Sequence, residues 1–194
     1  MTQPNEEMTV TDPYQVLVTE GTFGVLDDGV IAVETADWSN GLVAPMTQGA
    51  LVVTGINTGY VGVTLLAQDS PPAELAADTW DEIAEVSLHA PTGNLQVESL
   101  DLGPVANDPA LLTPSGPGWY RLRVHAQGRE TLRDKTSMEP VEHYLLITWP
   151  GRWEDTVILR TSEDIERRLH TQLTNTVKGP TPLSESNPPT RRPN

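Results

Sequence analysis

The residues from Trp119 to Ala126 alternate without interruption between two kinds of side chain. The core-type positions are Tyr120, Leu122, Val124 and Ala126, and the intervening positions are Trp119, Arg121, Arg123 and His125. Because successive side chains of a strand point to opposite faces, this pattern predicts a strand with one face in a core and the other in solvent. The chain is therefore expected to build its core from sheets.

Similar strand signals recur along the chain, with short turns between them. They cover residues 14–19, 22–26, 30–35, 49–57, 60–67, 82–90, 95–100, 142–149 and 156–160. Residues 49–57 and 60–67 are the most apolar of these runs and are expected to be central strands. About ten strand signals with almost no helix predict an all-β fold, either an antiparallel β-sandwich or a flattened barrel.

Two of the turns predict hairpins. Asp27-Asp28-Gly29 separates residues 22–26 from 30–35, and Asn57-Thr58-Gly59 separates residues 49–57 from 60–67. Both contain residue types that tolerate the positive φ angles of a tight hairpin turn. Gly55 and Gly62, which lie inside strand signals, predict a bulge or a close approach of another backbone.

The ends of the chain differ in composition from its middle. We expect a flexible arm over residues 1–11, one β-sandwich domain over residues 12–160, a short helix over residues 161–170 and a disordered tail over residues 171–194. Ser162 is a suitable N-cap for that helix, and acidic residues follow in its first turn. The tail is rich in proline and polar residues and lacks the apolar side chains that ordering requires.

The composition excludes several classes of function. A net charge of −15 and a pI of about 4.4 argue against direct binding to nucleic acid. The chain has no cysteine, which excludes disulfides, thiolate metal sites and a cysteine nucleophile. Its first residues do not resemble a secretory signal, and no segment approaches the roughly 20 apolar residues of a membrane span. We expect a soluble cytoplasmic protein.

No combination of residues predicts catalysis, a metal site or a cofactor. The chain contains no P-loop, dinucleotide fingerprint, Gly-x-Ser-x-Gly or His-Glu-x-x-His pattern, so an enzyme is not expected. One group of residues shares the predicted solvent face of neighbouring strands: His89, Arg121, Arg123 and His125. They form either an anion-binding or acid–base patch, or ordinary cross-strand partners of Glu85 and Glu98, and the second interpretation is favoured.

The two signs of charge are distributed unevenly. No lysine or arginine precedes Arg121, whereas acidic residues occur throughout that region. If several of them converge on one surface, they suit a basic partner. The candidate partner-binding residues are Asp27, Asp28, Glu34, Asp37, Trp38, Asp78, Asp81 and Glu82, and the acids in turns and connections are expected to be exposed.

The order of several motifs resembles the competence protein J family, small bacterial proteins that bind and inhibit a DNA-entry nuclease. The resemblance spans residues 12–150 and is carried by Tyr14-Gln15, Asp37-Trp38 with Gly41, Gly49-Ala50, Val97-Glu98-Ser99, Gly118-Trp119-Tyr120 and Tyr144. The chain departs from the family in longer loops at residues 68–81 and 102–115 and in its long C-terminal tail. The resemblance implies a β-sandwich whose partner is a basic nuclease.

Two hypotheses about function follow. The first is a non-enzymatic acidic domain that binds a basic protein, as an inhibitor or immunity protein of a nuclease does. The alternative is a structural or accessory β-sandwich module whose acidity serves solubility. A contiguous surface patch of carboxylates would favour the first hypothesis, and a scattered distribution would favour the second.

Overall fold

The computed structural model describes residues 13–72, 79–105 and 112–162. Within these ranges the chain forms strands β1 to β12 and one short 3-10 helix, η1 (Val33–Thr35). The all-β fold class is thus confirmed. The predicted arm and tail, Asp78 and all but the first two residues of the predicted helix lie outside the described residues.

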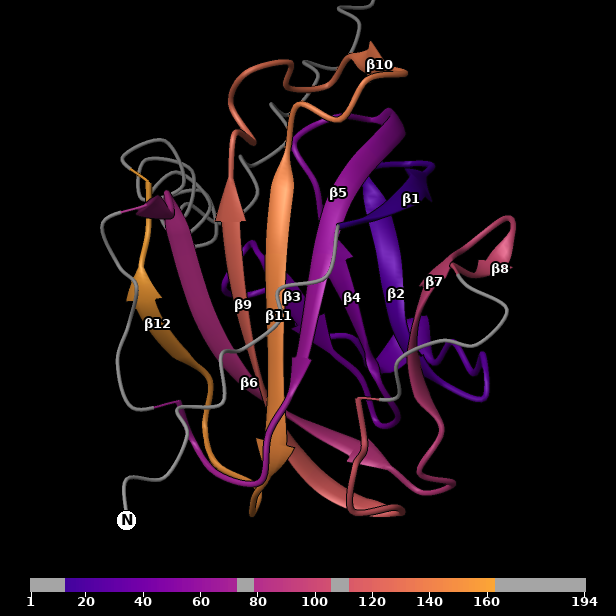
Figure 1. The fold of residues 1–194 in the computed structure, drawn as a ribbon, viewed down its shortest axis with the longest axis vertical. Coiled ribbons are helices and arrows are strands. Elements are labelled where there is room, and N and C mark those ends of the chain that lie inside the picture. The colour runs from indigo at the N-terminus through magenta and orange to yellow at the C-terminus, as the bar shows by residue number, and fades with distance from the viewer. Residues whose placement is uncertain (1–12, 73–78, 106–111, 163–194) are drawn as a thin grey trace, which may run out of the picture. The chain divides into compact units, whose positions relative to one another are not determined.

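The larger of two sheets lies in front in Figure 1 and has the strand order β1-β5-β11-β9-β6-β12, with β10 paired to β5. Its strands are β1 (Tyr14–Val18), β5 (Thr58–Ala67), β6 (Glu82–Ala90), β9 (Gly118–Gln127), β10 (Thr136–Ser137), β11 (His143–Pro150) and β12 (Val157–Arg160). The alternating strand around Leu122 is β9, which pairs with β6 on one side and β11 on the other.

The smaller sheet lies behind the larger one in Figure 1 and has the order β3-β4-β2-β7-β8. Its strands are β2 (Thr22–Asp27), β3 (Val43–Pro45), β4 (Ala50–Val53), β7 (Leu95–Ser99) and β8 (Gly103–Pro104). All of its neighbouring strands are antiparallel.

The main apolar core is built from both sheets, which makes the fold a β-sandwich. Phe23 of β2 packs edge-on against Tyr144 of β11, with 5.4 Å between the ring centroids. The predicted inner face of β9 is almost completely buried, and Leu122 is 0% exposed. Burying a side chain of this size stabilises the fold by about 1.5–3 kcal/mol relative to leaving it in water.

The larger sheet is not wholly antiparallel, which corrects the predicted antiparallel arrangement. Both β11 and β10 pair with β5 in the parallel sense. β5 ends at Ala67 and β11 begins at His143, so no tight turn joins them. A tight turn forces antiparallel pairing, whereas a long connection permits either direction.

The predicted hairpin at Asp27-Asp28-Gly29 is wrong, although the turn itself has the expected geometry. Asp28 and Gly29 have φ angles of 52° and 67°. The segment after the turn does not pair with β2, because β2 already has β4 on one side and β7 on the other. Residues 30–35 therefore run over the surface and include η1, with Val30, Ile31 and Val33 exposed.

The predicted hairpin between residues 49–57 and 60–67 is also wrong, because β4 and β5 belong to different sheets. The corner between them is held by the buried carboxylate of Glu142, which accepts hydrogen bonds from the backbone N–H groups of Gly55 and Ile56. Gly55 has the predicted close approach, since a Cβ atom there would lie 1.8 Å from the carbonyl oxygen of Arg129. Both strands are central in their sheets, as predicted.

Candidate functional site: an aromatic and acidic groove

Two of the predicted partner-binding residues are buried. Asp27 is 0% exposed and Glu82 is 2% exposed, so the expectation that they lie on the surface is wrong. Buried carboxylates need hydrogen bonds or a cation to offset the loss of hydration, and both have them. Neither side chain is accessible to a partner.

Asp27 ties the Asp27-Asp28-Gly29 turn to the loop after β6. Its carboxylate accepts hydrogen bonds from the backbone N–H and the hydroxyl of Thr92 and from the backbone N–H of Asn94, at 2.7–2.8 Å. The side-chain amide of Gln48 donates to it as well. Asp27 is therefore a structural residue that joins β2 to the β6–β7 connection.

Glu82 forms a buried ion pair with Arg129, whose Nη1 donates to the glutamate Oε2. The Ser162 hydroxyl donates to the other glutamate oxygen at 3.0 Å. Arg129 also donates from Nη2 to the carbonyl of Gly41, while its buried Nε has no hydrogen-bond partner among the described residues. The pair joins the start of β6 to the loop after β9, and Arg129 could not be predicted as the partner of Glu82 because it lies 47 residues away in the chain.

The predicted solvent face of β9 is in fact covered, except at Trp119. Arg121, Arg123 and His125 are 3%, 8% and 2% exposed. Glu85, which is opposite Arg123 in the register, accepts hydrogen bonds from both arginines at 3.4 and 2.5 Å. The cross-strand interpretation is confirmed for Glu85, whereas Glu98 lies on β7 of the smaller sheet and takes no part in it.

Aromatic rings complete this covered layer. The Arg123 guanidinium lies 5.5 Å from the centroid of the Trp149 ring, and the His125 ring lies 5.5 Å from that of Trp80. Burial lowers the pKa of His125 below its ordinary value of 6.5, partly opposed by a hydrogen bond to the Leu145 carbonyl. A buried histidine with a lowered pKa packs as a neutral ring. Because Arg121, Arg123 and His125 are all buried, they do not form the exposed acid–base patch that was the alternative interpretation.

Burial of the arginines leaves the described surface strongly acidic. The exposed acidic residues are Glu20, Asp28, Glu34, Asp37, Asp69, Asp81, Asp101, Glu130, Asp134, Glu139, Glu154 and Asp155. Of the lysines and arginines in the described ranges, only Lys135, Arg152 and Arg160 are exposed. The internal arginines neutralise internal carboxylates, so little positive charge remains to balance the outer ones.

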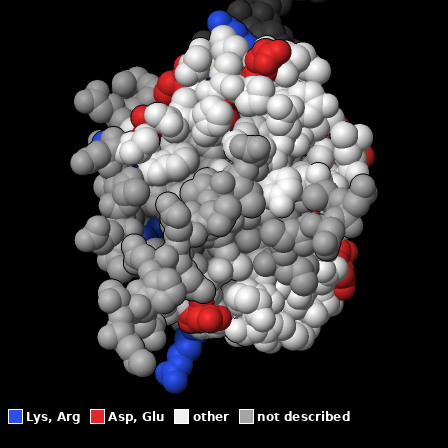
Figure 2. All heavy atoms as spheres, in the orientation of Figure 1, with Lys and Arg blue, Asp and Glu red and all other residues white. Residues whose placement is uncertain are grey.

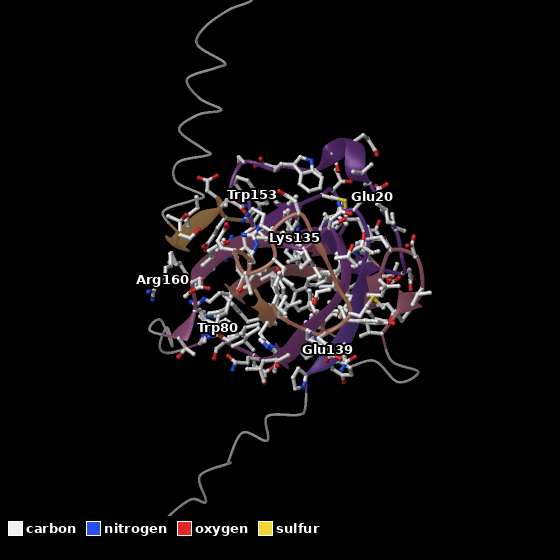
Figure 3. The ribbon with its side chains drawn as sticks, turned by 90° about the horizontal axis from the view of Figure 1, so that it is seen from above. Glu20, Trp80, Lys135, Glu139, Trp153 and Arg160 are labelled. Atoms are coloured by element: carbon white, nitrogen blue, oxygen red, sulfur yellow. The ribbon has the colours of Figure 1, made fainter. Side chains whose placement is uncertain are left out.

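The exposed carboxylates do not gather into one patch. Asp81 precedes β6, whereas Asp37 lies in a groove that is also lined by Ser87 and Trp119, toward the other end of the β6–β9 ladder. Glu20 and Glu139 lie apart at the margin of the domain in Figure 3. In Figure 2 the described atoms of the larger sheet's outer side are mostly uncharged, with carboxylates toward the margins.

A groove of about 510 Å³ lies between the two sheets at one side of the sandwich. One wall comes from the β3 edge of the smaller sheet and the segment before it, and includes Asp37 and Met46. The other wall is the segment between β11 and β12, and includes Trp153, Glu154 and Asp155. Ser87 of β6 and Trp119 of β9 also line it. We call this feature the Trp119–Trp153 groove.

The second wall of the Trp119–Trp153 groove is fixed by its backbone. The Ser87 hydroxyl donates to the Glu154 carbonyl and accepts from the Glu154 N–H, at 2.9 and 2.8 Å. Arg121 donates to the carbonyls of Glu154 and Asp155. Arg121, which was predicted to be a surface cation, is therefore buried and hydrogen-bonded to the backbone of this wall. The side chains of Trp153, Glu154 and Asp155 are exposed.

Of the predicted partner-binding residues that the structure describes, only Asp37 lines the groove. Sequence reasoning missed Trp119, Trp153, Glu154 and Asp155 as site residues. A signal was present, because Trp153-Glu154-Asp155 follows a Pro-Gly turn and repeats the acid-next-to-tryptophan pattern of Asp37-Trp38. What the sequence did not show is that the fold brings these two loops together.

Other site types find no support in the described ranges. They contain no group of three or more potential metal-ligating histidine or acidic side chains. None of the helices described there is long and apolar enough to cross a membrane.

Comparison with known proteins adds little. No protein-family model matches the chain, and no curated protein matches it. A solved structure named crocagin biosynthetic gene J aligns with a TM-score of 0.44 and 17% sequence identity, covering 75% of this chain and 100% of the other. A likeness at this level carries no functional argument, so the function has to be argued from the residues themselves.

Proposed function

We propose that this chain is a non-enzymatic, acidic β-sandwich of the cytoplasm that binds a basic protein, and that it acts as an inhibitor or immunity protein of a basic nuclease. The observation that supports this proposal is the charge of the described surface. Acidic residues are exposed in large excess, whereas Arg121, Arg123 and Arg129 are buried in ion pairs.

Such a surface attracts a cationic protein over several ångströms before contact. Complementary potentials raise the rate of encounter and suppress binding to partners of the wrong sign. A nuclease carries positive charge where it binds the phosphates of nucleic acid, so an acidic protein can bind at the same surface. The resemblance of the motif order to the competence protein J family points in the same direction.

A second candidate is a structural or accessory module whose acidity serves solubility. The scatter of the exposed carboxylates favours it, since Asp37 and Asp81 lie near opposite ends of β6. In that case the charge keeps the molecule apart from others and selects no partner.

One experiment separates the two candidates. The chain is immobilised, exposed to lysate of its native host at low salt, and eluted at moderate salt, and the eluted proteins are identified by mass spectrometry and assayed for nuclease activity. Recovery of a basic nuclease that loses activity on addition of the free chain supports inhibition. Recovery of only acidic or structural proteins, with capture insensitive to salt, refutes it and leaves the accessory module.

A further inference from the structure

We propose that the Trp119–Trp153 groove binds an arginine side chain of the basic partner, with the guanidinium between an indole ring and a carboxylate. This inference rests on the proposed function for the existence of a basic partner. It adds the place of contact and the chemical group recognised.

The two indoles are the first part of the argument. Trp119 and Trp153 are 42% and 62% exposed, whereas Trp149, in the covered layer of the same sheet, is 4% exposed. Trp119 is stacked on His89 with 4.8 Å between ring centroids, which fixes its orientation. Large aromatic side chains left in water beside a groove are typical of binding sites, because they supply much contact area with few rotatable bonds.

The carboxylates are the second part. Asp37, Glu154 and Asp155 all line the groove, and among the described residues none of them takes part in an ion pair. Among the described residues, the Asp37 carboxylate accepts a hydrogen bond from the backbone N–H of Ser39, at 3.0 Å. No described ion pair neutralises these three carboxylates, so an incoming cation can pair with one of them.

Rigidity of the second wall is the third part. Ser87 and Arg121 hold the backbone of Glu154 and Asp155 by four hydrogen bonds of 2.8–3.3 Å. A ligand therefore has to order only side chains when it binds. Preorganisation of this kind strengthens binding by lowering its entropic cost.

Arginine fits these features better than lysine. Its planar guanidinium stacks on an aromatic ring and can donate two parallel hydrogen bonds to a carboxylate, while the lysine ammonium does neither. The groove of about 510 Å³ also has room for the backbone on either side of the arginine, since pockets for small ligands span about 300–1,000 Å³.

The test uses a capped Gly-Arg-Gly peptide, its citrulline counterpart and its lysine counterpart. Citrulline keeps the shape of arginine and removes the charge. The full chain is labelled with ¹⁵N, and the indole N–H signals of its five tryptophans are followed during titration. We expect the signals of Trp119 and Trp153 to move and that of buried Trp149 to stay, with the arginine peptide binding about tenfold more tightly than the citrulline peptide.

Variants locate the effect. Trp153→Ala is expected to weaken binding of the arginine peptide about fivefold. Met138→Ala is the matched control, because Met138 is 63% exposed, close to the 62% of Trp153, and does not line the groove. Replacing Glu154 by Gln together with Asp155 by Asn keeps the backbone contacts and is expected to abolish the preference for arginine over citrulline.

The inference is overturned if the Trp119 and Trp153 signals do not move, if citrulline binds as tightly as arginine, or if Met138→Ala has the same effect as Trp153→Ala. Its failure is distinct from failure of the proposed function. If a basic nuclease is captured and Trp153→Ala does not affect its capture, the groove is not the contact site but the inhibitor proposal stands. If the arginine peptide binds but no nuclease is captured, the groove binds arginine but the inhibitor proposal is refuted.

Discussion

The buried pair of Glu82 and Arg129 allows a sharp test of how this fold handles its internal charge. Each partner is 2% exposed, and Arg129 additionally donates to the Gly41 carbonyl. Arg129→Met keeps most of the side-chain volume, removes the cation, and leaves Glu82 with the Ser162 hydroxyl as its remaining donor among the described contacts. The expected outcome is a large loss of stability at neutral pH.

The size of that loss follows from what the variant leaves behind. The Glu82 carboxylate stays buried, has a hydroxyl donor in place of its cation, and does not regain the hydration that it lost on folding. Removing one partner of a buried ion pair typically costs about 3–5 kcal/mol, and a loss of this size is expected here.

Urea unfolding followed by tryptophan fluorescence measures this loss. The free energy of unfolding is compared between Arg129→Met and the unsubstituted chain at about pH 7. The matched control replaces Glu82 by Leu as well, which is expected to restore most of the stability. A loss below about 1 kcal/mol, or a double variant no more stable than Arg129→Met, would refute the assignment of a buried, mutually compensating pair.

Three further predictions concern the core and its titrating groups. Leu122→Ala, at a fully buried position of β9, should cost about 2–5 kcal/mol in a thermal or urea melt, and a loss below about 0.5 kcal/mol would contradict the packing. Burial, and secondly the charge of Asp28, raise the pKa of Glu98 above 4.5. Glu98 therefore binds its proton more tightly in the folded than in the unfolded protein, and stability is lost as the pH rises through that raised pKa. Glu98→Gln should raise the melting temperature at pH 7, with no gain below about pH 4. The lowered pKa of His125 has the opposite effect, so stability should fall as the pH drops below 6.5, and His125→Gln should flatten that part of the stability–pH curve.

The sequence was sufficient for most of the longer strands and for the inner face of β9, but residues 30–35 do not form the predicted strand and β3 was not predicted. Alternation over residues 119–126 identified β9 and its buried side correctly, and the bounds expected for residues 82–90 are those of β6. Alternation reports which residues share a face, and a core needs a continuous apolar face, so this inference is direct.

The outer face of β9 could not be predicted in the same way. Arginine and histidine were assigned to solvent by residue type, but Glu85 lies opposite Arg123 and the tryptophans at 80 and 149 add rings to the layer. Paired charges and amphipathic side chains tolerate burial when their polar groups are satisfied. Whether they are satisfied depends on strand register, which the sequence does not contain.

The hairpins were predicted wrongly and the groove was not predicted at all, for a related reason. The turn at Asp28 has the predicted φ angles, yet β2 finds its partners β4 and β7 elsewhere in the chain. The Trp119–Trp153 groove joins residues 35–47, β6, β9 and residues 153–156. Local residue preferences determine turns, whereas pairing between distant segments decides which loops meet.

The central claim is that the acidic surface selects a basic partner, and the rate of association tests it most directly. The on-rate of the nuclease captured by this chain is measured by stopped-flow mixing from about 10 mM to about 150 mM salt, over which the Debye length shrinks from about 30 Å to about 8 Å. The variant with Asp28, Asp37 and Asp81 replaced by Asn serves as the comparison, because all three are exposed. We predict that the on-rate falls at least about tenfold over this range and that the variant is slower and less sensitive to salt. An on-rate that does not change with salt, and is the same for the variant, would contradict the account.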